Sequence, residues 1–417
     1  MAAPRSLGPI ALIALGLNGV VGVGIYFVPA AVARQVSGNA GALVYALTAL
    51  ACLPVALAFA RLGRRFDRDG GPYVFARQAF GPRTAFVVGW LAYVSAIFST
   101  SAVIRGLSQS LPWTDELWSV HLTASAIVVI LTAVVAAGLK VSAWAWTGIT
   151  ALKLLPLFAL LAVAAVLLPQ PVPALQQAPA PTGNVLRGAL IVLFALQGFE
   201  IVAVPAGHVK NPRWVAVATI LALVGAACIY VGLQLACVRA LPELGASRAP
   251  LTEAAAAFGG PRLARLLTVA TSVSALGIGL GMIAMTPRYL AALGESDGFG
   301  RWLGYSNARG VPTRALAITA LLVLGLVQLG SLDELFAMSS IAVLAQYGST
   351  AASLIRLAWG RFQGLGRRDI VIGILAAITT IVVVAGAHWK ELLRAALVIG
   401  AGVVLKLLVA RRASAVP

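Results

Sequence analysis

A series of long apolar segments is the feature that most constrains how this chain can fold. A helix needs about 20 apolar residues to cross a bilayer. Because lipid offers no hydrogen bonds to the backbone, each such segment predicts a helix. The 417 residues are 60% hydrophobic and only 11% charged. The sequence therefore predicts an all-α polytopic membrane protein with twelve transmembrane helices, at 7–33, 39–62, 75–107, 121–138, 142–168, 185–207, 214–240, 262–292, 313–330, 334–357, 369–387 and 391–410.

The net charge of +18 reflects membrane orientation rather than nucleic-acid binding. The basic residues lie in short loops between apolar segments, where the positive-inside rule operates. A cytoplasmic N-terminus places roughly twice as many Lys and Arg residues on the cytoplasmic side as on the other. We therefore expect a protein of the plasma (inner) membrane with both termini cytoplasmic and no nucleic-acid partner.

The first apolar segment contains a glycine-rich stretch at residues 18–26, with Gly19, Gly22 and Gly24 close together. Each glycine costs a helix interior about 1 kcal/mol relative to alanine. One interpretation is a helix broken at mid-membrane, whose freed N–H groups attract an anion such as a carboxylate. The alternative is that the glycines only allow close helix packing. This stretch alone does not favour either interpretation.

A second break is predicted in residues 194–200, where Gly198 is flanked by Gln197 and Glu200 in the sixth apolar segment. Both breaks stand first in successive blocks of five segments. Corresponding interruptions in two halves indicate a transporter with inverted repeats and therefore favour a binding site. We divide the chain into a first repeat (1–168), an external linker (169–184), a second repeat (185–357) and two additional helices (358–417).

Two charged residues lie deep inside predicted spans. Glu200 is the only one of the thirteen acidic residues that we place within a span, and Lys153 lies deep in the fifth. A charge at mid-bilayer is costly, so both are functional candidates. A buried ion pair or a hydrogen bond that packs helices is the structural alternative for each.

Five short motifs, in order along the chain, resemble those of the amino acid–polyamine–organocation family of permeases. They cover about residues 5–360, and each is weak alone. One position departs from many relatives, because His208 stands where they have glutamate. The motifs are Gly-Val-Gly-Ile-Tyr-Phe-Val-Pro at 22–29, Gly-Gly-Pro-Tyr at 70–73, Gln-Gly-Phe-Glu at 197–200, Val-Lys-Asn-Pro at 209–212 and Thr-Pro-Arg-Tyr-Leu at 286–290.

The resemblance implies the leucine-transporter fold, a 5+5 inverted repeat with broken helices 1 and 6 plus two additional helices. It also implies an amino acid substrate whose carboxylate binds the first break. The α-amino group would bind carbonyls of residues 195–197 and 18–20. Phe194 would be an aromatic gate, with simple packing as its alternative. The substrate-binding candidates are Val21, Gly22, Val23, Gly24, Ile25, Phe194, Ala195, Leu196, Gln197 and Gly198.

The resemblance also suggests roles for the two charged residues. Lys153 matches a lysine whose ammonium occupies the place of sodium in some relatives, and Glu200 matches a gating or proton-sensing glutamate. We expect sodium-independent transport that is proton-coupled or exchanging. Hydroxyls in the eighth span, at Thr271, Ser272 and Ser274, keep a sodium-coupled amino acid or polyamine symporter as the alternative.

Other functional classes find little support in the sequence. The three histidines, His121, His208 and His388, are far apart and lie near predicted helix ends, and no catalytic or Walker motif occurs. No repeated selectivity-filter loop indicates a channel. We expect no enzyme activity, cofactor or metal; membrane lipid and the substrate are the expected partners, with protons and a homodimer as open alternatives. Glu200 as the single pocket carboxylate favours a neutral substrate.

Overall fold

The structure is a computed structural model that describes residues 8–22, 24–66, 70–111, 113–114, 116–138, 143–167, 184–204, 209–296 and 302–413. Side chains in 143–153, 295–296 and 405–413 are outside that description. The external linker predicted at 169–184 is therefore outside the described residues, apart from Asn184.

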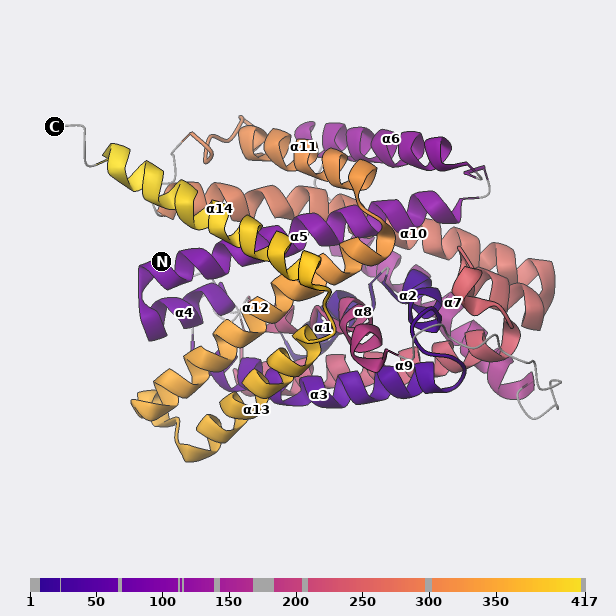
Figure 1. Cartoon of the computed structure of the whole chain (residues 1–417), viewed down its shortest axis with the longest axis horizontal. Helices are drawn as coiled ribbons and strands as arrows, with labels where there is room; N and C mark the ends of the chain where they lie inside the picture. Colours follow the sequence, from indigo (N-terminus) through magenta and orange to yellow (C-terminus); the bar gives the residue numbers. More distant parts are fainter. Residues whose placement is uncertain are drawn as a thin grey trace.

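The described residues fold into a bundle of long helices (Figure 1). Short 3-10 helices η1 (Phe199–Ala203), η3 (Leu244–Ala246) and η4 (Phe362–Gly364) connect some of them. The α-helices are α1 (Pro9–Val20), α2 (Gly24–Ala33), α3 (Ala40–Gly63), α4 (Pro72–Phe80), α5 (Pro82–Ser110), α6 (Leu117–Ala136), α7 (Ala143–Leu167), α8 (Val185–Leu196), α9 (Arg213–Ala240), α10 (Pro250–Ser296), α11 (Thr313–Leu329), α12 (Leu332–Trp359), α13 (Arg367–Val384) and α14 (Trp389–Ala413).

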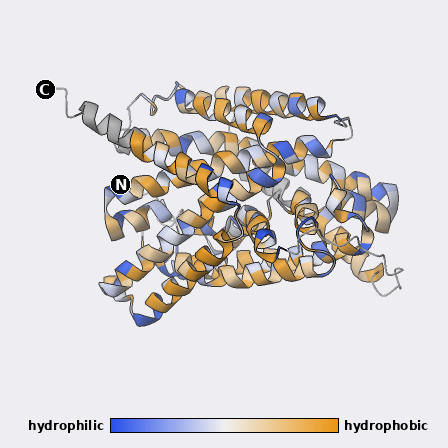
Figure 2. Ribbon diagram, in the orientation of Figure 1, coloured by the Kyte–Doolittle hydropathy of each residue, from blue (hydrophilic) through white to orange (hydrophobic). Residues whose placement is uncertain are grey.

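The helices support a multi-pass membrane protein. Among the described residues, six are long and apolar enough to cross a membrane, or up to eight if each of two bent helix pairs forms one span. Most residues along the helices coloured in Figure 2 are apolar, as membrane-spanning helices require. The count of twelve spans and the 5+5 repeat remain predictions.

The predicted third span, 75–107, is wrong in its boundaries. It comprises two helices, α4 and α5, which meet at Gly81. Gly81 has a φ of 86°, a left-handed conformation that glycine adopts without steric cost and that ends α4. Pro72 and Pro82 each begin a helix, because proline fits the first turn, where its missing N–H is not needed.

Helices α5 and α12 form the centre of the bundle, packed along each other. Within their apolar windows, 72% and 78% of the residues are buried, against 28% in α6. Helix α3 packs along α9, and α12 also packs along α13. A helix that is buried all round can carry polar side chains only where protein partners satisfy them. The polar side chains of α5 and α12 therefore need hydrogen-bond partners from neighbouring elements.

Ion pairs tie helix ends together at both ends of the bundle. At one end, Arg61 of α3 pairs with Asp369 of α13 at 3.1 Å. At the opposite end, Arg34, just after α2, makes two bonds of 3.1 and 2.7 Å to Asp333 of α12. Arg34 also donates to the carbonyl of Gly245 in η3. The half-helix α2 is thus fixed to the start of α12.

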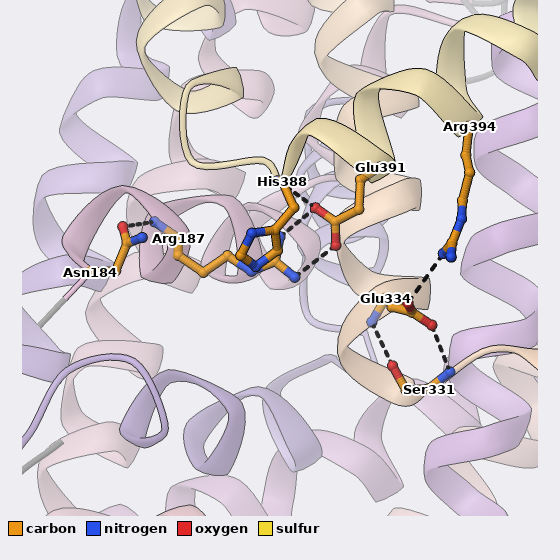
Figure 3. A network of polar contacts seen from close by, with 7 residues as sticks. All are labelled: Asn184, Arg187, Ser331, Glu334, His388, Glu391 and Arg394. Atoms are coloured by element: carbon orange, nitrogen blue, oxygen red, sulfur yellow. Dashed lines mark hydrogen bonds and ion pairs between the residues drawn. The ribbon is translucent and has the colours of Figure 1, made fainter. Parts of the chain in front are cut away.

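The half-helix α8 is fixed in the same region (Figure 3). Arg187 in its first turn makes two bonds, of 2.6 and 2.8 Å, to Glu391 of α14, and the backbone N–H of His388 donates to the same carboxylate. Arg187 and Glu391 are 5% and 3% exposed. Glu200 is therefore not the only acidic side chain held inside the bundle, because Glu391 and Asp369, in the first turns of α14 and α13, are also buried.

Candidate functional site

The predicted break in the first span lies between α1 and α2. Helix α1 ends at Val20, and α2 begins at Gly24. The N–H of Val21 donates to the carbonyl of Leu17 at 2.7 Å, and the N–H of Gly22 donates to Val20 at 2.6 Å. These two predicted substrate-binding amides are therefore already bonded. The N–H groups of the first turn of α2, from Gly24 and Ile25 onward, have no partner within their own helix.

The carbonyl end of this break is held by a residue that the sequence did not single out. Tyr230 of α9 donates its hydroxyl to the carbonyl of Val20 at 2.7 Å. Together with the bond from Gly22, this occupies both lone pairs of that oxygen. A single buried tyrosine in an apolar span gives no distinctive sequence signal, so the interaction could not be predicted.

The second predicted break follows α8. Gln197 has an extended backbone with a ψ of 154°, and Gly198 has a φ of 118°. The chain then continues as the 3-10 helix η1. An L-amino acid with a side chain rarely adopts the conformation of Gly198, so the glycine is required by the break. The carbonyls that end α8 lose their helical partners here.

The two breaks lie against each other. A Cβ on Gly198 would collide with the carbonyl of Gly19, and one on Gly19 would come within 2.8 Å of the Gly198 oxygen. A Cβ on Gly24 would lie 3.0 Å from Cα of Ala195 and 3.1 Å from Cδ1 of Phe194. The glycines therefore serve close backbone approach and chain interruption together, and binding of an anion at the first break stays a prediction.

Glu200 braces the second break against α12. One oxygen of its carboxylate accepts the N–H of Gly198 at 2.8 Å and the hydroxyl of Tyr347 at 2.9 Å. The rings of Phe199 and Tyr347 also lie 5.4 Å apart. A single acidic side chain thus connects the unwound backbone to the central helix of the bundle.

A polar cluster joins the second break to both central helices. Gln197 donates through Nε2 to Ser99 of α5 at 3.2 Å and to Ser339 of α12 at 3.1 Å, and the two hydroxyls lie 2.6 Å apart. Among the described residues, the Oε1 of Gln197 is buried without a hydrogen-bond partner. Turning the amide over would leave its nitrogen in that position instead. One buried polar atom of Gln197 thus has no hydrogen bond within the described part of the chain.

The other predicted site residues occupy different settings. Phe194 is 5% exposed, and its ring lies 4.4 Å from that of Phe336 on α12. Val21, Ile25, Ala195 and Leu196 are buried near the breaks. Val23, His208 and the side chain of Lys153 are outside the described residues, although the backbone at position 153 lies in α7.

The hydroxyl-bearing residues of the eighth predicted span lie in α10. Thr271 and Ser274 are buried at 5% and 1% exposure, and Ser272 is partly buried. Among the described residues, no cluster of three or more His, Cys, Asp or Glu side chains could hold a metal ion. The described site offers backbone N–H and carbonyl groups, side-chain hydroxyls, the side-chain amide of Gln197 and the carboxylate of Glu200.

Comparison with known proteins gives a consistent result. Residues 7–398 match the family described as amino acid permease. An uncharacterized transporter of Mycobacterium tuberculosis is 29% identical over 405 residues, 96% of this chain and 90% of the relative. Human cationic amino acid transporter 4 is 29% identical over 86% of this chain and 60% of its own length. Cationic amino acid transporter 2, vacuolar, of Arabidopsis thaliana is 25% identical over 83% of this chain and 58% of its own length.

Proposed function

The chain belongs to the amino acid permease family, a branch of the amino acid–polyamine–organocation transporters, and from this premise we propose that it is a sodium-independent secondary transporter. The family is one of permeases rather than enzymes, so the expectation of transport without enzyme activity is confirmed. In our proposal the chain moves amino acids by alternating access, either coupled to protons or in exchange.

The contact of the two breaks is the observation that carries this proposal. A free amino acid presents an anion and a cation on the same carbon atom, its Cα. The first turn of α2 offers N–H groups at the positive end of a helix dipole, and the end of α8 offers carbonyls at a negative end. Gly24 packs on Ala195, so these opposite ends lie side by side. Such a pair of half-helices is complementary to a zwitterion.

We assign the substrate's groups as follows. Its carboxylate binds the amides of Gly24 and Ile25, because those of Val21 and Gly22 are bonded within the protein. Its ammonium binds the carbonyls of residues 195–197, since the Val20 oxygen is already occupied. The side chain extends toward Phe194 and the free polar atom of Gln197.

The proposed repeats, additional helices and membrane orientation are those expected from the sequence. The repeats 1–168 and 185–357 alternate access to the site, with residues 358–417 as two further helices open to lipid or to a second copy of the chain. The excess of basic residues at one side supports both termini in the cytoplasm and a location in the plasma (inner) membrane.

The substrate side chain is either neutral or cationic, and a different observation supports each alternative. Glu200 is committed to Gly198 and Tyr347, which leaves no free carboxylate near the breaks among the described residues and supports a neutral amino acid. The names of the human and Arabidopsis relatives support a cationic one. A thermal-shift screen of the purified protein against the amino acids and common polyamines tests both, because a ligand stabilises the folded state that binds it. Stabilisation by none of them would contradict the proposal.

Lys153 is proposed as the fixed cation that replaces sodium and as a carrier of the transported proton. A lysine desolvated near helix-end carbonyls has its charged form disfavoured and can titrate during the cycle. We expect Lys153→Ala to lose accumulation driven by a pH gradient in proteoliposomes, while substrate binding measured by thermal shift persists. Full gradient-driven accumulation by this variant would remove Lys153 from the role.

Glu200 is proposed to couple the second break to pH. Its ionised carboxylate accepts two hydrogen bonds, and protonation weakens that acceptor, so the break is released from α12. We expect Glu200→Gln to flatten the pH profile of uptake, and Tyr347→Phe, which removes one donor, to displace the profile without flattening it. An unchanged profile in Glu200→Gln would count against this coupling.

A sodium symporter is the second candidate mechanism, supported by the buried hydroxyls of Thr271 and Ser274 on α10. Replacing external sodium with choline separates the two mechanisms directly. Sodium-independent transport predicts unchanged initial rates, and a rate that rises with sodium concentration would favour the symporter.

A further inference from the structure

A surface hollow of about 400 Å³ lies between the end of α4 and the last turns of α12. The residues that line it are Phe80, Ala352, Ile355, Arg356 and Trp359. Four of these five side chains are apolar, and Phe80 and Trp359 are 43% and 74% exposed. The hollow therefore opens outward, away from the broken helices, where a membrane protein meets lipid.

The mouth of this hollow carries positive charge. Arg356 lines it, and Arg77 lies three residues before Phe80, on the same face of α4. Both arginines are exposed. The described residues provide no carboxylate for either, whereas Arg61 of α3 pairs with Asp369. Within the described ranges, Arg356 at the hollow and Arg77, one turn before Phe80, thus have no carboxylate partner.

The position along α12 explains how these two properties can serve one ligand. Trp359 is the last residue of α12 and Gly360 caps it, so the hollow spans the change from apolar helix to polar loop. Exposed tryptophan is typical of the level of lipid headgroups. Ala352 and Ile355 lie one to two turns deeper, at the level of acyl chains.

We propose that this hollow binds an anionic phospholipid. Its acyl chain lies against Phe80, Ala352 and Ile355, and its phosphate is held by Arg356 and Arg77, since guanidinium groups pair with phosphate in two-point geometry. Basic pockets between membrane helices are suited to such headgroups. A zwitterionic lipid is disfavoured, because its choline cation would lie near both arginines. The bound lipid braces α12, the helix that carries Ser339 and Tyr347 to the breaks.

The test compares lipids on the full-length purified protein in detergent. Dioleoylphosphatidylglycerol or dioleoylphosphatidylcholine is added at equal concentration, and the rise in the thermal midpoint is measured. We expect phosphatidylglycerol to give the larger rise. In Arg77→Gln/Arg356→Gln that rise falls by at least half. The matched control Lys210→Gln/Arg213→Gln removes two exposed charges elsewhere and keeps the full rise.

A second variant separates the hollow from general charge effects. Ala352→Phe fills the hollow without changing charge. We expect this variant to lose most of the phosphatidylglycerol-induced rise in the thermal midpoint. In native mass spectrometry, we expect it to lose the adduct of the protein with phosphatidylglycerol. Because each rise is measured against the same variant without lipid, a lower starting midpoint does not affect the comparison. Equal rises with the two lipids, equal losses in both double variants, or an undiminished rise in Ala352→Phe would each overturn the proposal.

Discussion

Replacing Gly198 with alanine is expected to reduce amino acid uptake by at least about tenfold, which corresponds to about 1.4 kcal/mol. The new Cβ would collide with the carbonyl of Gly19 in the opposite break. The φ of 118° adds backbone strain, which costs about 1–3 kcal/mol for a residue with a side chain. Either relief, a shift of η1 or of α1, separates the amides and carbonyls that we assign to the substrate.

Initial rates of uptake into proteoliposomes, normalised to the amount of folded protein, measure this effect. Gly225→Ala is the matched control, because its Cβ would meet only Leu17 of α1 at an ordinary distance of 3.4 Å. We expect the control to retain near-normal uptake. Normal uptake by Gly198→Ala would show that close contact of the two breaks is not needed for transport.

Removing one partner of the Arg187–Glu391 pair is expected to cost about 3–5 kcal/mol of stability, because the other charge is left buried and unpaired. The two side chains are only 6% and 4% exposed and bond at two points. The pair holds α8 to the start of α14 (Figure 3). Unfolding in mixed micelles by sodium dodecyl sulfate measures the loss for Arg187→Leu and Glu391→Leu.

The double variant Arg187→Leu/Glu391→Leu distinguishes the pair from simple packing. We expect it to be more stable than either single variant, since no buried charge remains. Arg394→Leu is the control. Arg394, also on α14, pairs with Glu334 of α12; these side chains are 54% and 40% exposed, and such pairs contribute about 0–1 kcal/mol. Additive losses in the double variant would contradict the assignment of the cost to unpaired charge.

The broken helices could be predicted because their signal is local. Glycine at mid-span lowers helix stability wherever it occurs, so Gly22, Gly24 and Gly198 mark the interruptions without knowledge of the fold. That the breaks touch could not be predicted in the same way. The contact of Gly19 with Gly198 joins residues far apart in sequence, and it depends on how α1 packs against η1 and α2 against α8.

Polar partners across the bundle were also beyond the sequence. Glu200 stands out as an acid in an apolar span, but its partner Tyr347 is one of several polar residues on α12, and nothing in the spacing selects it. Glu391 lies at a predicted helix end and therefore looked solvent-exposed. Its burial arises because Arg187 of α8 meets it there. The joint at Gly81 was missed because α4 and α5 are both apolar enough to resemble one long span.

Exchange across a sealed membrane tests directly whether the two broken helices form the site that carries a zwitterion. Proteoliposomes loaded with an unlabelled amino acid that stabilises the protein are diluted into sodium-free buffer containing the same amino acid in labelled form. We expect saturable uptake above that of empty liposomes, and we expect the unlabelled L-enantiomer to inhibit it. In Gly198→Ala the uptake falls at least about tenfold. Uptake that does not saturate, or that Gly198→Ala leaves intact, would contradict a zwitterion site at the two broken helices.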